Sequence, residues 1–167
     1  MDYENLTAPC GINCAQCETY NDYEGKDPRK AKPLFLALIP LFSLMGLFSK
    51  TSRTRLRVLK RILRIPKDEP LCRGCRNHDG KIPVMAEGTL CPIYECTKAK
   101  ELHNCSLCSD FPCEHLFPKA FMAGIVPHNL KLANCCLIKK HGLEEWANDH
   151  SHKLKEDYFK GDLPIEL

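Results

Sequence analysis

The sequence predicts a mainly α-helical protein in which irregular, cysteine-rich loops precede a set of C-terminal helices, with a small α+β fold as the alternative. Three observations predict this class. Strand-like runs are sparse and short, as near Ile82 to Met85. Apolar residues recur at helical spacing in the central and C-terminal segments, and most of the 12 cysteines lie in turn-forming sequence. A hydrophobic content of 44% is sufficient for a folded core.

The chain of 167 residues fits one domain with an appended helical piece. We expect residues 1–116 to form a cysteine-rich domain that carries a helical apolar and basic insert at 33–67. Residues 117–167 should form a C-terminal helical extension packed on it.

The C-terminal extension carries clear helix boundaries. Asn129 can cap a helix that runs to about His141, and Gly142 is suited to end it. A last helix should contain Trp146 and Leu154, with Pro164 ending the structured chain.

The insert begins with an apolar run at 34–48, which is shorter than the roughly 20 residues that span a bilayer. A buried helix kinked at Pro40 is the simplest interpretation, and an interfacial membrane segment or a partner-binding segment are the alternatives.

A basic amphipathic helix is predicted at 50–67, where eight Lys and Arg residues occur without any Asp or Glu. The simplest interpretation of this segment is a helix whose basic face is exposed to solvent. Weak binding to nucleic acid phosphates or to an anionic membrane is the functional alternative, and the absence of aromatic residues argues against sequence-specific reading. The cations that would make this contact are Lys50, Arg53, Arg57, Lys60, Arg61 and Arg64.

The first nine residues contain acids and no apolar run, so no secretory signal is visible and we expect a reducing, cytoplasmic setting. Closely spaced cysteines are then ligands more often than disulfides. The C-x-x-C unit occurs three times, and each unit can place two thiolates on one metal ion. The metal candidates are Cys10, Cys14, Cys17, Cys72, Cys75, Cys91, Cys96, Cys105, Cys108 and Cys113.

The spacing suggests a partition. One site would combine Cys14/Cys17 with Cys72/Cys75, where Gly74 allows a sharp turn. The other would combine Cys105/Cys108 with Cys96 and Cys113. Cys10 and Cys91 would be exchangeable ligands or part of a third, incomplete site.

Zinc is the first candidate, because widely separated C-x-x-C units are typical of zinc knuckles, and a [4Fe-4S] cluster is the alternative. Cys10, Cys14 and Cys17 also have the C-x-x-x-C-x-x-C spacing of radical S-adenosylmethionine enzymes. The strand and helix alternation of such barrels is absent, however.

Other candidate groups are weaker. Cys135 and Cys136 lie on an apolar helical stretch, where we expect at least one to pack in the core, with a redox or ligand role as the alternative. His115, or His150 with His152, would be extra ligands only if they were not simply exposed.

Four motifs carry a family resemblance: C-G-I-N-C-A-Q-C at 10–17, C-R-G-C at 72–75, C-P-I-Y-E-C at 91–96 and C-S-L-C-S-D-F-P-C at 105–113. With them the chain resembles a family of small cysteine-rich bacterial and archaeal proteins defined as a domain of unknown function. The resemblance covers about Pro9 to Leu116 and implies a presumed zinc-binding domain, with no activity, substrate or catalytic residue. We therefore expect a small metal-binding protein that acts as an interaction module, with no activity assigned to it. An iron-sulfur electron carrier or redox sensor is the alternative.

Overall fold

The computed structural model describes residues 2–17, 20, 40, 60, 63–65, 72–81, 90–118 and 127–161. Several predictions therefore lie outside the described residues: almost all of the apolar run and the basic segment, the strand-like run near Ile82, the chain from 119 to 126, and the end at Pro164. Of the basic segment, Lys60 and Arg64 are described and exposed, and Leu63 is buried.

The described residues form short helices and loops, without a sheet; their only β pairings are isolated bridges between Thr7 and Asn13 and between Lys81 and Leu90. A mainly helical protein is thus confirmed, and the α+β alternative finds no support in these residues. The helices are α1 (Tyr3–Leu6), η1 (Cys14–Gln16), η3 (Arg76–His78), α4 (Pro92–Ala99), η4 (Cys105–Leu107), η5 (Glu114–Leu116), η7 (Pro127–Leu130), α5 (Lys131–His141), α6 (Leu143–Glu145), η8 (Trp146–His150) and α7 (Ser151–Lys160). Each η element is a 3-10 helix except η8, which is a π-helix.

Helix α4 is the longest helix within the described cysteine-rich region, and the sequence analysis did not anticipate it. Its signal is Pro92 at the first helical position, directly after Cys91 at the N-cap. Proline is favoured there because the first helical N–H groups have no partner within the helix.

Helix α5 starts slightly later than predicted. Leu130, not Asn129, is its N-cap residue, because Pro127–Leu130 forms the 3-10 turn η7 first. The predicted end is confirmed: α5 stops at His141, and Gly142 has a φ of 82°, which residues with a Cβ adopt only with strain.

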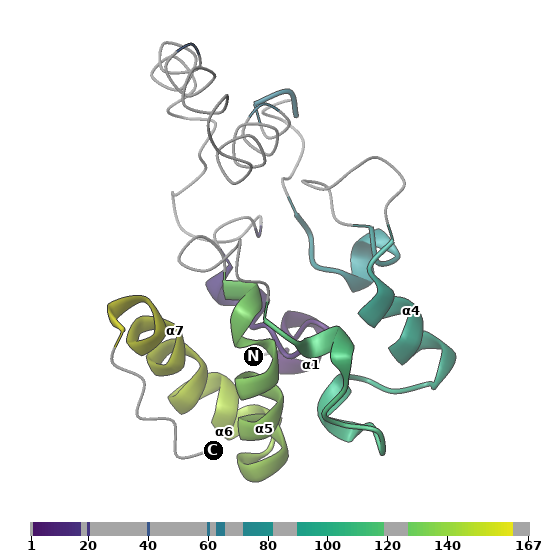
Figure 1. The fold of residues 1–167 in the computed structure, drawn as a ribbon, viewed down its shortest axis with the longest axis vertical. Coiled ribbons are helices and arrows are strands. Elements are labelled where there is room, and N and C mark those ends of the chain that lie inside the picture. The colour runs from purple at the N-terminus through teal and green to yellow at the C-terminus, as the bar shows by residue number, and fades with distance from the viewer. Residues whose placement is uncertain are drawn as a thin grey trace.

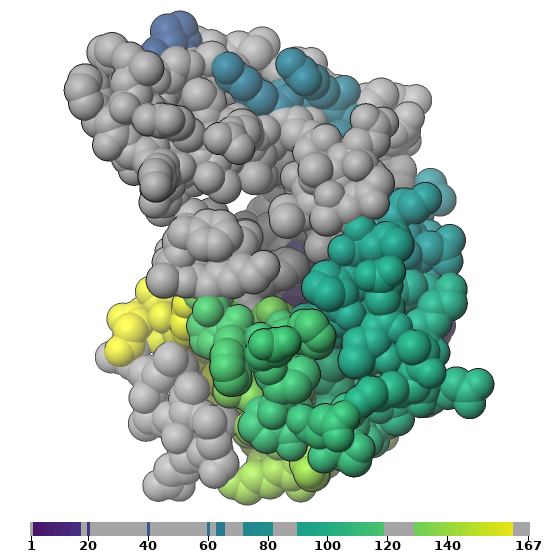
Figure 2. Space-filling model, turned by 45° about the vertical axis from the view of Figure 1, so that its right-hand side comes forward, coloured from purple at the N-terminus to yellow at the C-terminus, as the bar shows by residue number. Residues whose placement is uncertain are grey.

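The core joins the two ends of the chain. The N-terminal segment supplies Ala8 and Ile12, and the C-terminal helices supply Leu130 and Leu154 to the same buried cluster. Figure 1 shows α5, α6 and α7 together on one side of the N-terminal segment and α4 on the other. In Figure 2 the teal and green surface of the cysteine-rich part adjoins that of the C-terminal helices.

The largest fully buried side chain among the described residues is Trp146. Its indole Nε1 donates to the Oδ1 of Asn134 at 3.0 Å, so the buried N–H has a partner. No helix among the described residues has the length and apolar character needed to cross a membrane.

Candidate metal centres

The first C-x-x-C unit forms a capped 3-10 turn. The Oδ1 of Asn13 accepts from the N–H of Ala15 at 3.0 Å, and the N–H of Cys17 donates to the carbonyl of Cys14 at 3.0 Å. The N–H of Tyr20 then donates to the carbonyl of Cys17 at 2.9 Å. An Asn cap explains why the chain turns at this point, since its side chain replaces a backbone acceptor.

The third unit repeats this turn. The Oδ1 of Asn104 accepts from the N–H of Ser106 at 3.0 Å, and the N–H of Cys108 donates to the carbonyl of Cys105 at 3.1 Å. The N–H of Phe111 donates to the carbonyl of Cys108 at 3.3 Å. The two turns therefore share the pattern N-C-x-x-C-x-x-aromatic, a local repeat that the C-x-x-C spacing alone does not reveal.

The second unit lies beside the first. A Cβ placed on Gly74 would be 3.8 Å from the Sγ of Cys14, so these two loops are in contact. The N–H of Gly74 donates to the Sγ of Cys72 at 3.3 Å. Gly74 has a φ of +89°, which fits the sharp turn predicted for it.

A turn at Gly80 brings Cys91 next to the second C-x-x-C unit. The N–H of Gly80 donates to the carbonyl of Cys75 at 2.9 Å, and the carbonyl of Gly80 accepts from the N–H of Cys91 at 2.8 Å. The residue that caps α4 is thereby tied to the second C-x-x-C unit.

Six cysteines form what we call the first thiol group: Cys10, Cys14, Cys17, Cys72, Cys75 and Cys91. Neighbouring thiols in this group raise one another's pKa values, which reflects how close together they lie. Burial, together with the smaller effects of the thiols of Cys17, Cys10 and Cys72, raises the pKa of Cys14 to about 12. Burial also raises the pKa of Cys75, to which Cys10, Cys14, Cys91 and Cys72 add.

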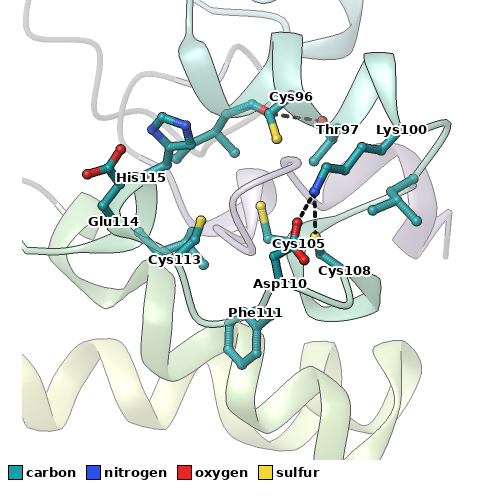
Figure 3. A pocket seen from close by; sticks show the side chains of 13 residues that line it. Cys96, Thr97, Lys100, Cys105, Cys108, Asp110, Phe111, Cys113, Glu114 and His115 are labelled. Carbon is teal, nitrogen blue, oxygen red and sulfur yellow. Dashed lines mark hydrogen bonds and ion pairs between the residues drawn. The ribbon is translucent and has the colours of Figure 1, made fainter.

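Four cysteines form the second thiol group: Cys96, Cys105, Cys108 and Cys113. Cys96 comes from α4, Cys105 from η4, and the other two from the loop that follows. All four line one cavity of about 210 Å³, which Figure 3 displays. Burial raises the pKa of Cys105 to about 12, with smaller effects from Cys10 and from the other three members of this group.

A lysine lies at the edge of this cavity. The Nζ of Lys100 is 3.4 Å from the Sγ of Cys108 and forms an ion pair with Asp110, as the dashed lines in Figure 3 mark. The hydrogen bonds to Asp110 and then to Cys108 raise the pKa of Lys100. A positive charge this close to a sulfur would offset part of the negative charge that four thiolates bring to a metal centre. Sequence reasoning missed Lys100, because only the fold brings it to the thiol.

Glu114 and His115 also line the cavity. The carbonyl of His115 accepts from the Nζ of Lys131 in α5 at 2.9 Å, which ties this loop to the C-terminal helices. The structure thus puts His115, but not His152, beside a thiol group. His152 faces Glu156 at 3.4 Å, whereas His150 lies with His141 and Glu145.

The two thiol groups are neighbours. The N–H of Cys105 donates to the carbonyl of Pro9 at 2.9 Å, which places η4 next to Cys10. Cys135 is fully buried between them, with its Sγ 3.5 Å from the carbonyl of Cys10, and Cys136 is partly exposed. The expectation that at least one of this pair packs in the core is confirmed.

The thiol sulfurs are not drawn tightly together. None of the 12 cysteines forms a disulfide. Within the described ranges, no three thiol sulfurs lie mutually within 4.8 Å. Four thiolates around one zinc ion at about 2.3 Å would have sulfurs about 3.8 Å apart, so a zinc ion would have to draw them inward. A cluster of several irons binds each thiolate at a different iron and holds its sulfurs further apart.

The ten cysteines predicted as ligands thus lie in two groups, close to the partition that the spacing suggested, and their binding of metal stays a prediction. Cys96, Cys105, Cys108 and Cys113 surround one cavity, and Cys14/Cys17 lie with Cys72/Cys75. Cys10 and Cys91 both join the first thiol group. This group then has six cysteines, whereas a single tetrahedral site uses four.

Fold and thiol groups together define a small, mainly helical, cysteine-rich protein. The family described as "Protein of unknown function (DUF3795)" matches residues 6–118, and the chain belongs to this family. The match includes all ten cysteines of the two thiol groups and ends before the C-terminal helices. No curated protein and no solved structure matches the chain.

Proposed function

We propose that this protein binds metal through its two thiol groups, with one centre in each. The observation that supports this most directly is the second thiol group, in which four cysteines from two chain segments line one cavity. Cysteines buried only as small apolar side chains would have no reason to converge on a cavity, whereas metal ligands must.

The energetics of the loops support the same proposal. Burial raises the pKa of Cys10 to about 11 and that of Cys14 to about 12, so both thiols are neutral near pH 7 in the metal-free protein. Bound metal replaces those protons, and the free energy of binding becomes free energy of folding. The loops around the thiols consist largely of 3-10 turns, so metal bonds would fix segments that regular secondary structure does not.

A single zinc ion in each centre is the first candidate. C-x-x-C units separated along the chain are the ordinary source of ligands for a structural zinc site, and such sites contribute to folding without catalysis. The protein would then be a metal-stabilised module. We assign no catalytic residue.

A [4Fe-4S] cluster in the second thiol group is the second candidate, and a specific observation favours it. The four thiols line a cavity of about 210 Å³, which offers room for a multi-atom cluster that binds one thiolate at each iron. The protein would then carry electrons or sense redox conditions.

Two further parts of the proposal rest on the sequence alone. The chain would divide into a cysteine-rich domain at 1–116 and a helical extension at 117–167, and it would work in a reducing cytoplasm. An anionic partner would bind through the basic segment at 50–67.

Metal analysis of protein purified without oxygen tests the proposal. Zinc in a colourless sample supports the first candidate. Iron with acid-labile sulfide in a brown sample supports the second. Protein without stoichiometric metal, or with native disulfides among the ten cysteines, would overturn the proposal.

A further inference from the structure

Two histidines and a glutamate meet where α5 passes into the last helices. The Nδ1 of His141 lies 2.8 Å from the Oε1 of Glu145, and the Nε2 of His150 lies 3.4 Å from the same oxygen. The two imidazole rings are 4.1 Å apart between centroids and tilted by 31°. One ligand atom from each residue lies within 4.8 Å of the other two.

The π-helix η8 is what aligns Glu145 with His150. These residues are five positions apart, and in an α-helix of 3.6 residues per turn they would point about 140° away from each other. In η8 the N–H of Ser151 donates to the carbonyl of Trp146, five residues back, so the chain winds more widely and the two side chains meet. Single π turns within helices often occur at functional sites.

The wide turn is anchored from within the C-terminal helices and by the N-terminal segment. The indole of Trp146 is fully buried and bonded to Asn134. The hydroxyl of Tyr3 donates to the Oδ1 of Asn148 at 2.9 Å. Both anchored residues lie between Glu145 and His150 in the chain, so these contacts hold the turn that carries the two ligand residues before any ligand arrives.

The residue after the turn is held as well. The Oγ of Ser151 accepts from the Nδ2 of Asn13 at 3.0 Å and from the Nε2 of Gln16 at 2.9 Å. Asn13 and Gln16 belong to the first C-x-x-C turn, so the end of η8 is fastened to the cysteine-rich region.

We propose that His141, Glu145 and His150 bind one divalent first-row transition metal ion such as Zn²⁺. Imidazole nitrogen and carboxylate oxygen are ligands that this ion accepts at about 2.1 Å, and two such ligands in a tetrahedron lie about 3.4 Å apart. The 3.4 Å pair already has this spacing, and the 2.8 Å pair would open slightly when the metal replaces the direct hydrogen bond.

Access and coordination number suit a solvent-facing site. The side chains of His141, Glu145 and His150 are 23%, 53% and 30% exposed. An ion can therefore enter without unfolding the helices. Three protein ligands leave a fourth position for water or for an external ligand. This site shares no residue with the thiol groups.

The competing explanation is a surface hydrogen-bonded pair without metal. The chain contains such a pair close by, since His152 and Glu156 are 3.4 Å apart with no third ligand within the described residues. His152→Gln is therefore the matched control for His150→Gln: both variants remove an imidazole that faces a glutamate in the same helical run.

The test uses the full chain, purified without oxygen with its thiol centres as isolated, and titrated with Zn²⁺ in a calorimeter. Wild type and His152→Gln should bind one additional ion. His141→Gln and His150→Gln should weaken that step at least tenfold. Glu145→Gln should weaken this binding step too. Because Gln is nearly isosteric with Glu, this variant should keep the fold even if a histidine variant does not.

Equal binding by His150→Gln, Glu145→Gln and wild type, or no additional ion in wild type, would overturn the site. Co²⁺ separates this result from the first proposal, because thiolate ligation gives intense near-ultraviolet charge-transfer absorption and imidazole with carboxylate does not. Thiolate absorption without the additional step would refute only the histidine site. The additional step in protein that was isolated without metal, and that shows no thiolate absorption with Co²⁺, would refute only the thiol centres.

Discussion

Replacing Gly80 by alanine should destabilise the protein through a steric conflict with α4. Gly80 has a φ of +74°, and a Cβ at this position would lie 2.3 Å from Cδ1, 2.6 Å from Cγ and 2.9 Å from Cβ of Tyr94. A rotamer change of Tyr94 would move its Cγ and Cδ1 but would leave its Cβ 2.9 Å away, so it relieves the conflict only in part and costs the packing of the ring. The helix that carries Cys91 and Cys96 would have to move away from the turn that holds Cys75.

The magnitude has two parts. A residue with a Cβ at positive φ costs about 1–2 kcal/mol. Overpacking against a fixed neighbour costs about 1–3 kcal/mol more. Gly161→Ala is the matched control, because Gly161 has a φ of +81° and a Cβ there would meet nothing within 4 Å. Gly161→Ala should therefore show only the cost of placing a Cβ at a positive φ.

The assay is urea unfolding of both variants and of wild type, with the midpoint compared at constant slope. Gly80→Ala should lose about 1–3 kcal/mol more than Gly161→Ala. Adding Tyr94→Ala should recover much of that difference by opening the space. Equal losses in the two glycine variants, or no recovery in the double variant, would refute the packing of α4 on this turn.

Three further predictions test other parts of the structure. Trp146→Phe removes the donor to buried Asn134 and should cost about 2–3 kcal/mol in thermal or urea unfolding; a loss below about 0.5 kcal/mol would mean that this bond is not formed. Lys100→Met removes the cation beside the Cys108 sulfur and should weaken metal binding by the second thiol group about tenfold, measured by competition with a chelator, and unchanged affinity would count against a role for Lys100. In the reduced, metal-free protein, burial raises the pKa of Cys10 to about 11, above the roughly 8.5 of an unfolded thiol. The unfolded chain therefore loses its proton first, so stability should be complete below about pH 8.5 and should fall as the pH rises toward 11, and a flat profile in urea unfolding would contradict that burial.

Local signals were enough to predict part of this architecture. The C-x-x-C units bring two sulfurs together within four residues, so each pair follows from spacing alone. The end of α5 at His141 was predictable for a similar reason, since Gly142 is the adjacent residue and takes the positive φ itself. In these cases the determining interactions lie within one or two turns of the chain.

Features that depend on distant contacts were not predictable. Cys91 joins the first thiol group because the turn at Gly80 folds back on Cys75. Lys100 reaches Cys108 only after α4 and the following loop pack together. No pattern in one stretch of sequence encodes either contact.

The π-helix is the clearest example of such a feature. Glu145 and His150 have the wrong spacing for one face of an α-helix, so sequence reasoning paired His150 with His152 instead. The register changes where Trp146 is buried and where Ser151 is held by Asn13, more than one hundred residues away in the chain. A histidine cluster of this kind becomes visible only in three dimensions.

The most direct test of the central claim is metal content per chain in three anaerobically purified variants. Cys14→Ser/Cys17→Ser should remove only the centre of the first thiol group, and Cys105→Ser/Cys108→Ser only that of the second. Cys136→Ser, a partly exposed cysteine outside both groups, should keep both centres. Equal metal content in all three and in wild type would contradict the account, as would metal loss in Cys136→Ser alone.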